Sequence, residues 1–520
     1  VVRMPGLVGA IYARYSRAPG GFRDILLKEF IEEGKTNSKK AQNFIEKVLV
    51  NFGDESVGEL EGTHLSLEKI SNLATKEIED RRIGGSPIEQ SSRYVVYDQL
   101  DEQGRFRYYC DPLIIASSLG KEFVDGMDAV FRCYTGLVEP MKEFFKKIKP
   151  IQEAEYAIKP KDQTKYRLSE LADPDDIRAF KTTYGFDIKS KACDTIRCLL
   201  PAATTTNVGI YGNGRFFQNM LTHLYSHDLA EMHDIAARAH AELNTEIPVF
   251  VKRAERSQYL VETRRNMWEV ARRVIENNHP ESNLERVVLL ENEGDKGYVD
   301  NMVAQMLFPF TTLSLQALRK RVRSFPESQK QHIINTYIGN RRTRFDRSGR
   351  GLEFGYPFTF NLIGNFGMYR DLHRHRMLTQ ERQLLTTELG FDIPQNIIEA
   401  GHGEKVQECI NTSKNLWEKL ANDLSPEIAQ YAVLFGFNIQ WTMGMNLREA
   451  QHMLELRTGP QGHPDYRKMC QDMNALVTER FPGIKPATGF VNYNDYFWSR
   501  AESEARQRQK ERQLAQKEGE

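Results

Sequence analysis

Apolar residues recur at helical spacing along much of the chain, and short runs of consecutive apolar residues separate these segments. The clearest helical pattern lies between the two halves, where Leu260 and Met267 recur among Arg and Glu residues. It predicts one helix over roughly 251–286, closed by the polar cluster at 277–280. The apolar run at 286–290 then predicts a strand. We therefore expect a helix-rich chain with a few short strands.

The two halves of the chain repeat one layout. Each half has a strand-like opening, helices, an arginine cluster, more helices, and an Asn-x-Arg motif that precedes a long helical pattern. The landmarks are Arg81-Arg82 and Asn213-Gly214-Arg215 in the first half, and Arg374-His375-Arg376 and Asn446-Leu447-Arg448 in the second. The landmarks lie farther apart in the first half because it carries a polar insert near 150–190, which we expect to be a surface elaboration rather than core.

This repetition predicts an α+β protein of two tandem domains, each with a small mixed or antiparallel sheet and long helices. The expected boundaries are 1–250 for the first repeat, 251–286 for a connecting helix, 287–498 for the second repeat and 499–520 for a charged tail. The length of 520 residues also exceeds what one hydrophobic core usually supports. Length and pattern therefore agree on two domains.

Charge and composition exclude several partners. The chain has 71 Lys and Arg residues and 71 Asp and Glu residues, so its formal net charge of zero offers no general attraction to nucleic acid or to an anionic membrane. No apolar run approaches the roughly 20 residues that a membrane helix needs. The six cysteines are scattered without a C-x-x-C pair, as in reduced cytosolic proteins. We expect a cytoplasmic protein with a small-molecule ligand, and neither a membrane nor a nucleic acid as its partner.

The densest group of ligand-type residues in the first half lies over residues 81–94. Glycines there allow close approach of the backbone, and hydroxyls, a carboxylate and an amide accompany three arginines. That combination suits an anionic ligand rich in hydrogen-bonding groups, such as a nucleotide. On residue types alone, a solvated loop with a serine helix cap is the alternative interpretation.

The order of these residues resembles the signature of the flavin-dependent thymidylate synthases (ThyX), RHRxxSxxxxSxRY. Ser86, Ser91, Arg93 and Tyr94 follow the arginine cluster at the signature spacing. Residues 53–59 resemble the GHxSxxE segment of that family, 197–201 its ARxxLP element and 213–215 its NxR element. Four matches in the same order make the resemblance specific.

The second half resembles the same family through different residues. Its matches are the full RHR at Arg374-His375-Arg376, the NxR at Asn446-Leu447-Arg448, Glu353 at the end of GHxSxxE, and an LxLR stretch ending at Arg457 with His463 after it. Beyond the RHR its signature decays, with Thr379 and Leu384 at the serine positions and Gln430 at the ARxxLP arginine. The resemblance therefore covers most of the chain as a degenerate tandem duplication.

The resemblance implies separate roles for three groups of residues. Those expected to bind dUMP are Glu89, Gln90, Ser91, Arg93 and Arg197. Those expected to bind FAD are Ser56, Glu59, Arg81, Arg82, Asn213, Arg215, Glu353, Arg374, His375, Arg376, Asn446, Arg448 and His463. Arg457, which would lie against the uracil, and Ser91 are expected to act in catalysis, and His227 takes the place of that arginine in the first half. Guanidinium and hydroxyl donors suit a phosphomonoester, and a pair of fixed positive charges suits the pyrophosphate of FAD.

The implied activity is reductive methylation of dUMP to dTMP, with FAD as cofactor and NADPH and methylenetetrahydrofolate as co-substrates. Sites in this family lie between the subunits of a homotetramer, so a homodimer of the tandem chain is the expected equivalent, with sites shared between the halves. Two other interpretations stay open. One is a catalytically degenerate descendant that binds flavin or nucleotide, or that serves as a structural or regulatory partner. The other is a methyltransferase acting on uracil in another carrier.

No metal site is expected. His223 and His227 are four residues apart and share one side of a helix, but no unambiguous third ligand accompanies them. Histidines that pack against a neighbouring helix are the simpler interpretation. The arginine run at 341–350 suits either contact with a phosphate or a solvated loop.

Overall fold

The computed structural model describes residues 11, 22–32, 35–36, 58–159, 162, 164–275, 280–281, 284–290, 295–340, 349–353, 358–480, 488–498, 505 and 507–510. Ser56, the arginine run apart from Arg350, and most of the predicted charged tail lie outside these residues.

The first repeat is built on a three-stranded antiparallel sheet in the order β3–β5–β4. Its elements are β3 (Gly62–Ser71), α4 (Asn72–Glu79), β4 (Gly85–Glu89), α5 (Pro112–Ala116), α6 (Gly120–Ile148), η3 (Ile151–Glu153), η4 (Leu168–Glu170), α7 (Pro174–Ile196), η5 (Arg197–Leu199), β5 (Thr205–Asn213), α8 (Gly214–Tyr225), α9 (Ala230–Glu246) and α10 (Pro248–Val251). Ahead of them come α2 (Phe22–Ile25), η1 (Leu26–Phe30), β1 (Ile31–Glu32) and β2 (Lys35–Thr36). Two strands lead directly into capped helices: Ser71 caps α4 and Asn213 caps α8.

The second repeat has a four-stranded antiparallel sheet in the order β6–β7–β9–β8. Its elements are β6 (Val287–Leu289), α12 (Asp295–Leu307), η6 (Phe308–Phe310), α13 (Leu315–Arg323), α14 (Glu327–Ile338), η7 (Arg350–Glu353), β7 (Phe358–Asn365), α15 (Phe366–Leu372), β8 (Thr379–Arg382), α16 (Gln395–Glu399), α17 (Gly403–Asp423), α18 (Pro426–Ala429), η8 (Gln430–Ala432), β9 (Asn438–Met445), α19 (Leu447–Arg457) and α20 (Pro464–Arg480). Asn365 caps α15 and Asn446 caps α19, as Ser71 and Asn213 do in the first repeat. The α+β prediction with two small sheets is confirmed, and the predicted strand at 286–290 is β6.

The predicted single helix over 251–286 is wrong in length. α11 spans Gln258–Val274 and begins after Ser257, whose side chain accepts a hydrogen bond from the Leu260 amide at 3.4 Å. This cap sets the start of the helix, and residues 284–286 ahead of β6 are not helical. The buried face of α11, with Met267 and Val270, packs with α12 to α14 in a hydrophobic core separate from the main one.

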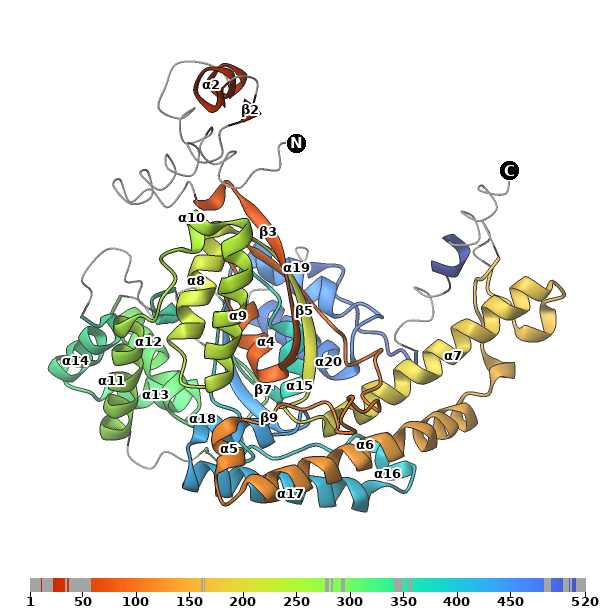
Figure 1. The fold of residues 1–520 in the computed structure, drawn as a ribbon. Coiled ribbons are helices and arrows are strands. Elements are labelled where there is room, and N and C mark those ends of the chain that lie inside the picture. Colours follow the sequence, from red (N-terminus) through yellow and green to blue (C-terminus); the bar gives the residue numbers. More distant parts are fainter. Residues whose placement is uncertain are drawn as a thin grey trace.

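The insert near 150–190 is not purely a surface elaboration. α6 and α7 form a long hairpin that projects from the body of the molecule (Figure 1). Tyr156, Ile158 and Phe180 are nevertheless buried within it, and the Tyr156 hydroxyl donates to Asp187 at 2.8 Å. The prediction failed because these apolar residues are spaced among many charged ones, with no continuous apolar stripe in the sequence.

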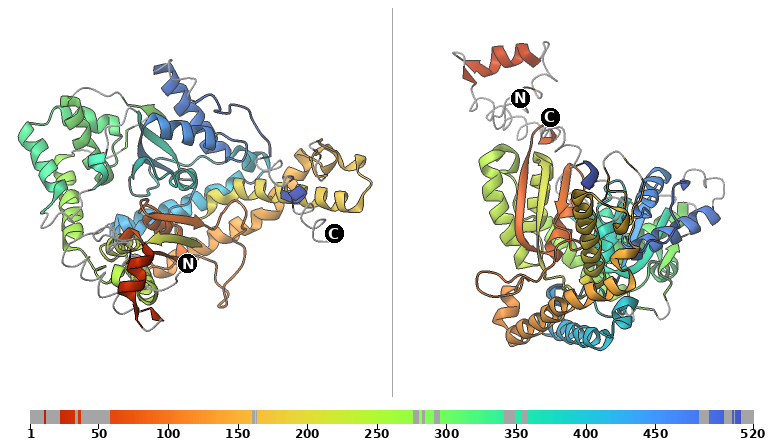
Figure 2. Two further views of the ribbon diagram at one scale, coloured as in Figure 1. Left: turned by 90° about the horizontal axis from the view of Figure 1, so that it is seen from above. Right: turned by 90° about the vertical axis from the view of Figure 1, so that its right-hand side faces the viewer.

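The two sheets differ in how they are covered. All residues of β9, and all of β7 except the last, are buried, because α12 and α13 pack on one face of that sheet. Gln305 of α12 donates to Thr442 at 2.7 Å, and the Leu315 amide of α13 donates to Asn361 at 3.2 Å. β5 of the first sheet instead alternates in burial, and its outer face stays open among the described residues (Figure 2).

Equivalent segments of the two repeats are joined by backbone hydrogen bonds. The Ala202 amide donates to the Val433 carbonyl, and the Phe435 amide donates to the Leu200 carbonyl, both at 2.8 Å. Between them, Pro201 pairs with Leu434 in an antiparallel bridge. These equivalent segments pair in antiparallel orientation, so the two repeats face each other. Their arginine clusters therefore approach the same interface.

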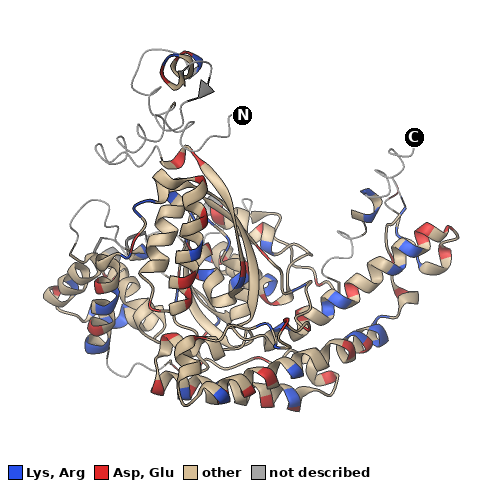
Figure 3. Ribbon diagram, in the orientation of Figure 1, with Lys and Arg blue, Asp and Glu red and all other residues tan. Residues whose placement is uncertain are grey.

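Charged residues of both signs are interspersed over the outer helices, including α6 and α17 (Figure 3). Positive and negative residues are therefore equal in number over the chain and also intermixed on these helices. Within the described part of the chain, none of the helices has both the length and the apolar character that crossing a bilayer requires.

Two glycines of α6 test the packing between the repeats. A Cβ added at Gly126 would lie 2.6 Å from Cδ1 of Leu416 on α17, whereas one added at Gly136 meets nothing within 4 Å. Gly136→Ala should stabilise the protein by up to about 1 kcal/mol through helix propensity. We expect Gly126→Ala to lose that gain, with a lower midpoint of urea unfolding than Gly136→Ala. Equal midpoints for the two variants would contradict close contact between α6 and α17.

Candidate functional site at the repeat interface

Charged side chains of the two repeats are buried against each other where β4 meets α15. Glu89, at the end of β4, accepts a hydrogen bond from Lys76 at 3.0 Å and contacts the Arg370 guanidinium. Arg370 also donates to Ser92 at 3.2 Å. The charged side chains of this group are at most 5% exposed. Buried charges need close partners, so this group holds the second repeat in register with the first.

The same network continues along α4. Lys76 lies 2.5 Å from Glu79, and His373 of the second repeat lies 3.0 Å from Asp80. Arg350 donates to Asp80 at 2.7 Å. Burial alone would raise the pKa of Glu79, but Lys76 and His373 hold it at about 2. Glu79 of α4 and Asp80, the residue after it, are therefore ionised, and both contact His373 of the second repeat.

Arg93, expected to bind a phosphate, pairs with a carboxylate of its own repeat. Its Nε and Nη2 each donate to Asp194 at 2.7 Å, and its Nη1 donates to the Gln461 carbonyl of the second repeat at 3.0 Å. Burial would lower the pKa of Arg93, but Asp194 raises it well above its usual value. A phosphate at this position would have to compete with Asp194.

Arg197, the second arginine expected to bind the nucleotide, also meets a carboxylate. Its Nη2 donates to one oxygen of Asp371 at 3.0 Å, and Arg374 donates to the other oxygen at 3.3 Å. Burial would raise the pKa of Asp371, but Arg197 and its cationic neighbours hold it well below its usual range. One carboxylate thus joins a nucleotide-type arginine to a flavin-type arginine of the other repeat.

Arg457, the predicted catalytic arginine, is positioned by a buried histidine. Its Nε donates to His375 Nε2 at 2.8 Å, and His375 Nδ1 lies 3.0 Å from Glu449. Since Nε2 accepts, the ring proton is on Nδ1 and is donated to Glu449. Burial lowers the pKa of His375, with Arg457 acting in the same direction. The imidazole is therefore neutral near pH 7 and fixes the direction of the Arg457 guanidinium.

Two further flavin-type residues also bridge the repeats. Arg376 donates to the Gly85 carbonyl at 2.8 Å and to the Ser86 hydroxyl at 2.9 Å. His463 Nδ1 accepts a hydrogen bond from the Asp465 amide at 3.3 Å, so its Nε2 carries the proton that faces the Asp194 carbonyl at 3.2 Å. Arg374 and Arg376 are exposed, whereas His375 between them is buried.

The remaining predicted residues have local roles or lie elsewhere. Ser91 accepts from the Arg93 amide at 3.3 Å, and Gln90 accepts from Arg107 at 3.3 Å. The side-chain oxygens of Asn213 and Asn446 cap their helices at 2.8 and 3.0 Å, so part of the NxR pattern is structural. The side chains of Glu353 and Arg448 lie outside the described part of the structure.

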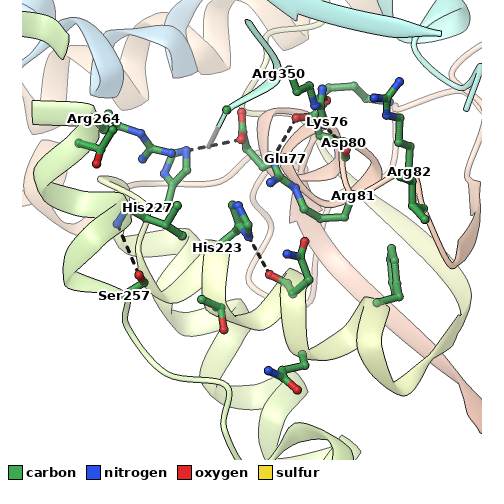
Figure 4. A pocket seen from close by; sticks show the side chains of 18 of the residues that line it. Lys76, Glu77, Asp80, Arg81, Arg82, His223, His227, Ser257, Arg264 and Arg350 are labelled. Atoms are coloured by element: carbon green, nitrogen blue, oxygen red, sulfur yellow. Dashed lines mark hydrogen bonds and ion pairs between the residues drawn. The ribbon is translucent and has the colours of Figure 1, made fainter. Parts of the chain in front are cut away.

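A cavity of about 880 Å³ opens between α4, α8, α11 and β8 (Figure 4). The first-repeat residues predicted to bind flavin line it: Glu59, Arg81, Arg82, Asn213 and Arg215. Ion pairs fix its walls. Arg382 donates to Glu77 at 2.8 Å, and Arg264 lies 3.3 Å from Asp228. Lys76, Asp80 and Arg350 of the ion-paired interface also line this cavity, so the cavity and the interface adjoin where the two repeats meet.

His223 of α8 and His227, which lies two residues past the end of that helix, both line this cavity, so the expectation that the pair shares one side of a helix is wrong. Figure 4 shows His227 facing Glu77 of α4, with Arg264 beside it, and the ring lies 3.7 Å from that carboxylate. Burial lowers the pKa of His227 to about 4, although Glu77 opposes the shift. Among the described residues, no group of three or more histidine, cysteine and acidic side chains is placed to hold a metal.

Glu381 of β8 gives the cavity a group that titrates near neutral pH. Burial raises the pKa of this carboxyl to about 7, since the stabilising Arg350 is opposed by the negative charge of Asp80. Arg81 and Glu77 are the other charges that act on it. Near pH 7 the Glu381 side chain is thus divided between its protonated and ionised forms.

Sequence reasoning missed the carboxylates that hold the arginines. Asp194 stands three residues before Arg197, and Asp371 stands three residues before Arg374. An acid one helical turn ahead of each motif arginine was the available signal. The pairing of Asp194 with Arg93, about a hundred positions away, had no local signal at all.

These features define a class of two-repeat α+β proteins with an arginine-rich interface between the repeats. Residues 8–249 and 321–483 match the model of the thymidylate synthase complementing protein family. The chain is 37% identical to a UPF0159 protein of Chlamydia muridarum (96% of this chain, 93% of the relative). It is 28% identical to a UPF0159 protein of Thermoplasma acidophilum (96% and 98%). The chain therefore belongs to the thymidylate synthase complementing protein family, the ThyX family, as the sequence motifs predict.

Removing Asp194 tests the buried pairing of Arg93. Asp194→Ala should lower the free energy of unfolding by about 3–5 kcal/mol, because it leaves a buried guanidinium without its carboxylate. Asp234→Ala, which breaks the exposed pair with Arg238 on α9, should cost at most about 1 kcal/mol. Urea unfolding of both variants measures the difference. A similar small cost for both would contradict a tightly paired Arg93.

Glu381 predicts a pH dependence of stability. The pKa of Glu381 is about 7 in the folded protein, above its ordinary value of 4.5. The stability that the protonated carboxyl contributes is therefore complete below pH 4.5 and is lost as the pH rises from there through 7. Glu381→Gln should match the wild type at pH 5 and melt at a higher temperature than the wild type at pH 8. Glu388→Gln, at an exposed position nearby, serves as the control. If the melting temperature of Glu381→Gln differed from that of the wild type by the same amount at pH 5 and pH 8, the raised pKa would be contradicted.

Proposed function

We propose that this protein is a flavin-dependent thymidylate synthase that reductively methylates dUMP, using FAD and methylenetetrahydrofolate. Family membership supports a thymidylate synthase-like protein, and one structural observation carries the finer assignment. The nucleotide-type residues kept by the first repeat lie against the flavin-type residues kept by the second. Asp371 joins Arg197 to Arg374, and the carbonyl of Asp194, whose carboxylate pairs with Arg93, lies 3.2 Å from His463.

The donor set suits the proposed ligands. Arg374 and Arg376 are exposed guanidinium groups on either side of the buried, neutral His375. These two arginines would supply the fixed positive charge that a pyrophosphate requires. Arg93 and Arg197 would hold the phosphate of the nucleotide, with Ser91 beside them. Asp194 and Asp371 occupy these two arginines in the structure, so a bound phosphate would replace the carboxylates as their partner.

Arg457 is the residue proposed to act on the reacting base. Bound FAD, once reduced, would supply the redox chemistry of the methyl transfer. The guanidinium of Arg457 would offset negative charge that develops on the uracil ring, and a preoriented charge of this kind is commonly a large part of catalysis. His375 holds Arg457 in one direction, and Glu449 holds His375 in one tautomer. His375 and Glu449 are therefore positioning residues.

One observation favours a second candidate, a descendant that binds ligands without catalysis. Glu89, Arg93 and Arg197 are all paired with internal charges, so substrate binding must exchange existing ion pairs. Such an exchange costs desolvation and rearrangement that an open site would not require. A protein that takes up FAD but shows no turnover would match this candidate.

Release of tritium from dUMP labelled at carbon 5 tests the proposal. With FAD, NADPH and methylenetetrahydrofolate supplied, the wild type should release tritium, and Arg457→Ala should be at least about 100-fold slower because a preoriented charge is lost. Arg105→Ala changes an exposed arginine paired with Asp101 and should keep the wild-type rate. A wild type as inactive as Arg457→Ala would overturn the proposal in favour of the non-catalytic candidate.

A further inference from the structure

We propose that Cys133 and Cys409 form a reversible disulfide bond, which joins the two repeats covalently when the folded protein meets a hydroperoxide. Cys133 lies on α6 of the first repeat, and Cys409 lies on α17 of the second. All six cysteines are free thiols in the structure, so both members of the pair are available for this reaction. The inference is independent of the proposed enzymatic activity and uses no residue of the predicted ligand sites.

The two helices that carry these thiols lie side by side along the base of the molecule (Figure 1). Glu122 of α6 lies 2.6 Å from Lys419 of α17, and Gly126, one turn farther along α6, packs against Leu416. Residue numbers therefore rise along one helix as they fall along the other, so the helices are antiparallel. Because Gly126 has no side chain, the helix axes can approach closely.

The thiols meet farther along the same pair of helices. Cys133 Sγ lies 3.8 Å from the carbonyl oxygen of Lys405, which stands four residues ahead of Cys409 and thus on the same face of α17. The side chains of Cys133 and Cys409 are hydrogen-bonded to each other. A disulfide requires two side chains that point toward each other across a short distance, and this hydrogen bond requires the same arrangement.

Cys133 is the thiol suited to react first. The hydrogen bond from Cys409 lowers the pKa of Cys133, and Lys405 acts in the same direction, although burial and Glu408 oppose them. Cys409 is buried, and its pKa is raised by Cys133 and by burial. The thiolate is the nucleophilic form of cysteine, and Cys133 is also the more exposed of the two. We therefore expect the oxidant to attack Cys133, with Cys409 as the resolving thiol.

Hydrogen peroxide balances the reaction. The thiolate of Cys133 attacks one peroxide oxygen, the O–O bond breaks, and a sulfenic acid forms with release of hydroxide. The sulfur of Cys409 then displaces the sulfenic hydroxyl, which leaves as water with the Cys409 proton, and the S–S bond forms. Two thiols lose two electrons in total, and the peroxide is reduced to two molecules of water. In reducing compartments, disulfides of this kind are usually transient and respond to oxidants.

Cys198 of η5 is a third thiol of this region, but it is poorly suited to the reaction. It interacts electrostatically with Cys133 and Cys409. Burial raises the pKa of Cys198 to about 12, and its thiol donates to the Thr195 carbonyl at 3.4 Å. Since a protonated thiol is a weak nucleophile, we expect Cys198 to stay reduced.

Counting thiols after treatment of the full chain with hydrogen peroxide tests the bond. Free thiols titrated in urea should fall from six per chain to four, and should return to six once dithiothreitol has been added and removed. Mass spectrometry of a tryptic digest should find residues 133–142 joined to residues 406–414. Cys133→Ser and Cys409→Ala should each keep all their remaining thiols. Cys110→Ser, which removes another half-buried thiol of the first repeat, should still lose two.

Oxidation should also raise the melting temperature of the wild type and of Cys110→Ser, but not that of Cys133→Ser. The physical reason is that a bond closing a very long loop restricts the unfolded chain. Six free thiols in the treated wild type would overturn the inference. Thiol loss that dithiothreitol does not reverse would also overturn it, as would a cross-linked peptide containing Cys198 in place of Cys409 or a bond between two chains on a non-reducing gel. None of these results depends on whether tritium is released from dUMP.

Discussion

Pairing of buried charges between the two repeats is the constraint on which the rest of this structure depends. Glu89 meets Arg370 and Arg197 meets Asp371, each pair with one member from each repeat. Removing one member leaves a charge with neither water nor partner, which costs about 3–5 kcal/mol. The repeats therefore cannot shift past each other without breaking the network. The same pairs also decide which arginines remain available to a ligand.

The two meeting places of the repeats have diverged from each other. One brings together Arg93 and Arg197 of the first repeat with Arg374 and His463 of the second, joined through Asp194 and Asp371. The other has Leu384 and Gln430 at two of the motif positions and retains a cavity that Arg81 and Trp268 line. A duplication inside one chain permits this division, because a substitution in one repeat no longer changes both places at once.

The sequence predicted the family, the α+β class and the convergence of arginine-rich motifs, because the order and spacing of motif residues can be read directly from a sequence. It did not predict which carboxylates pair with the arginines. Asp194 reaches Arg93 only through the packing of α7, and the buried residues of α7 are hidden among charges. It also misjudged α11, since the Ser257 cap sets where that helix begins. Partners distant in sequence, and helix limits set by capping, required the structure.

The visible absorption spectrum of the FAD-loaded protein during titration with dUMP tests the central claim most directly. That claim is that residues of both repeats form one site for flavin and nucleotide. We predict that dUMP perturbs the flavin absorbance of the wild type, and that Arg93→Ala greatly weakens this response although its FAD content is unchanged. A protein that binds FAD but whose spectrum does not respond to dUMP would contradict the claim.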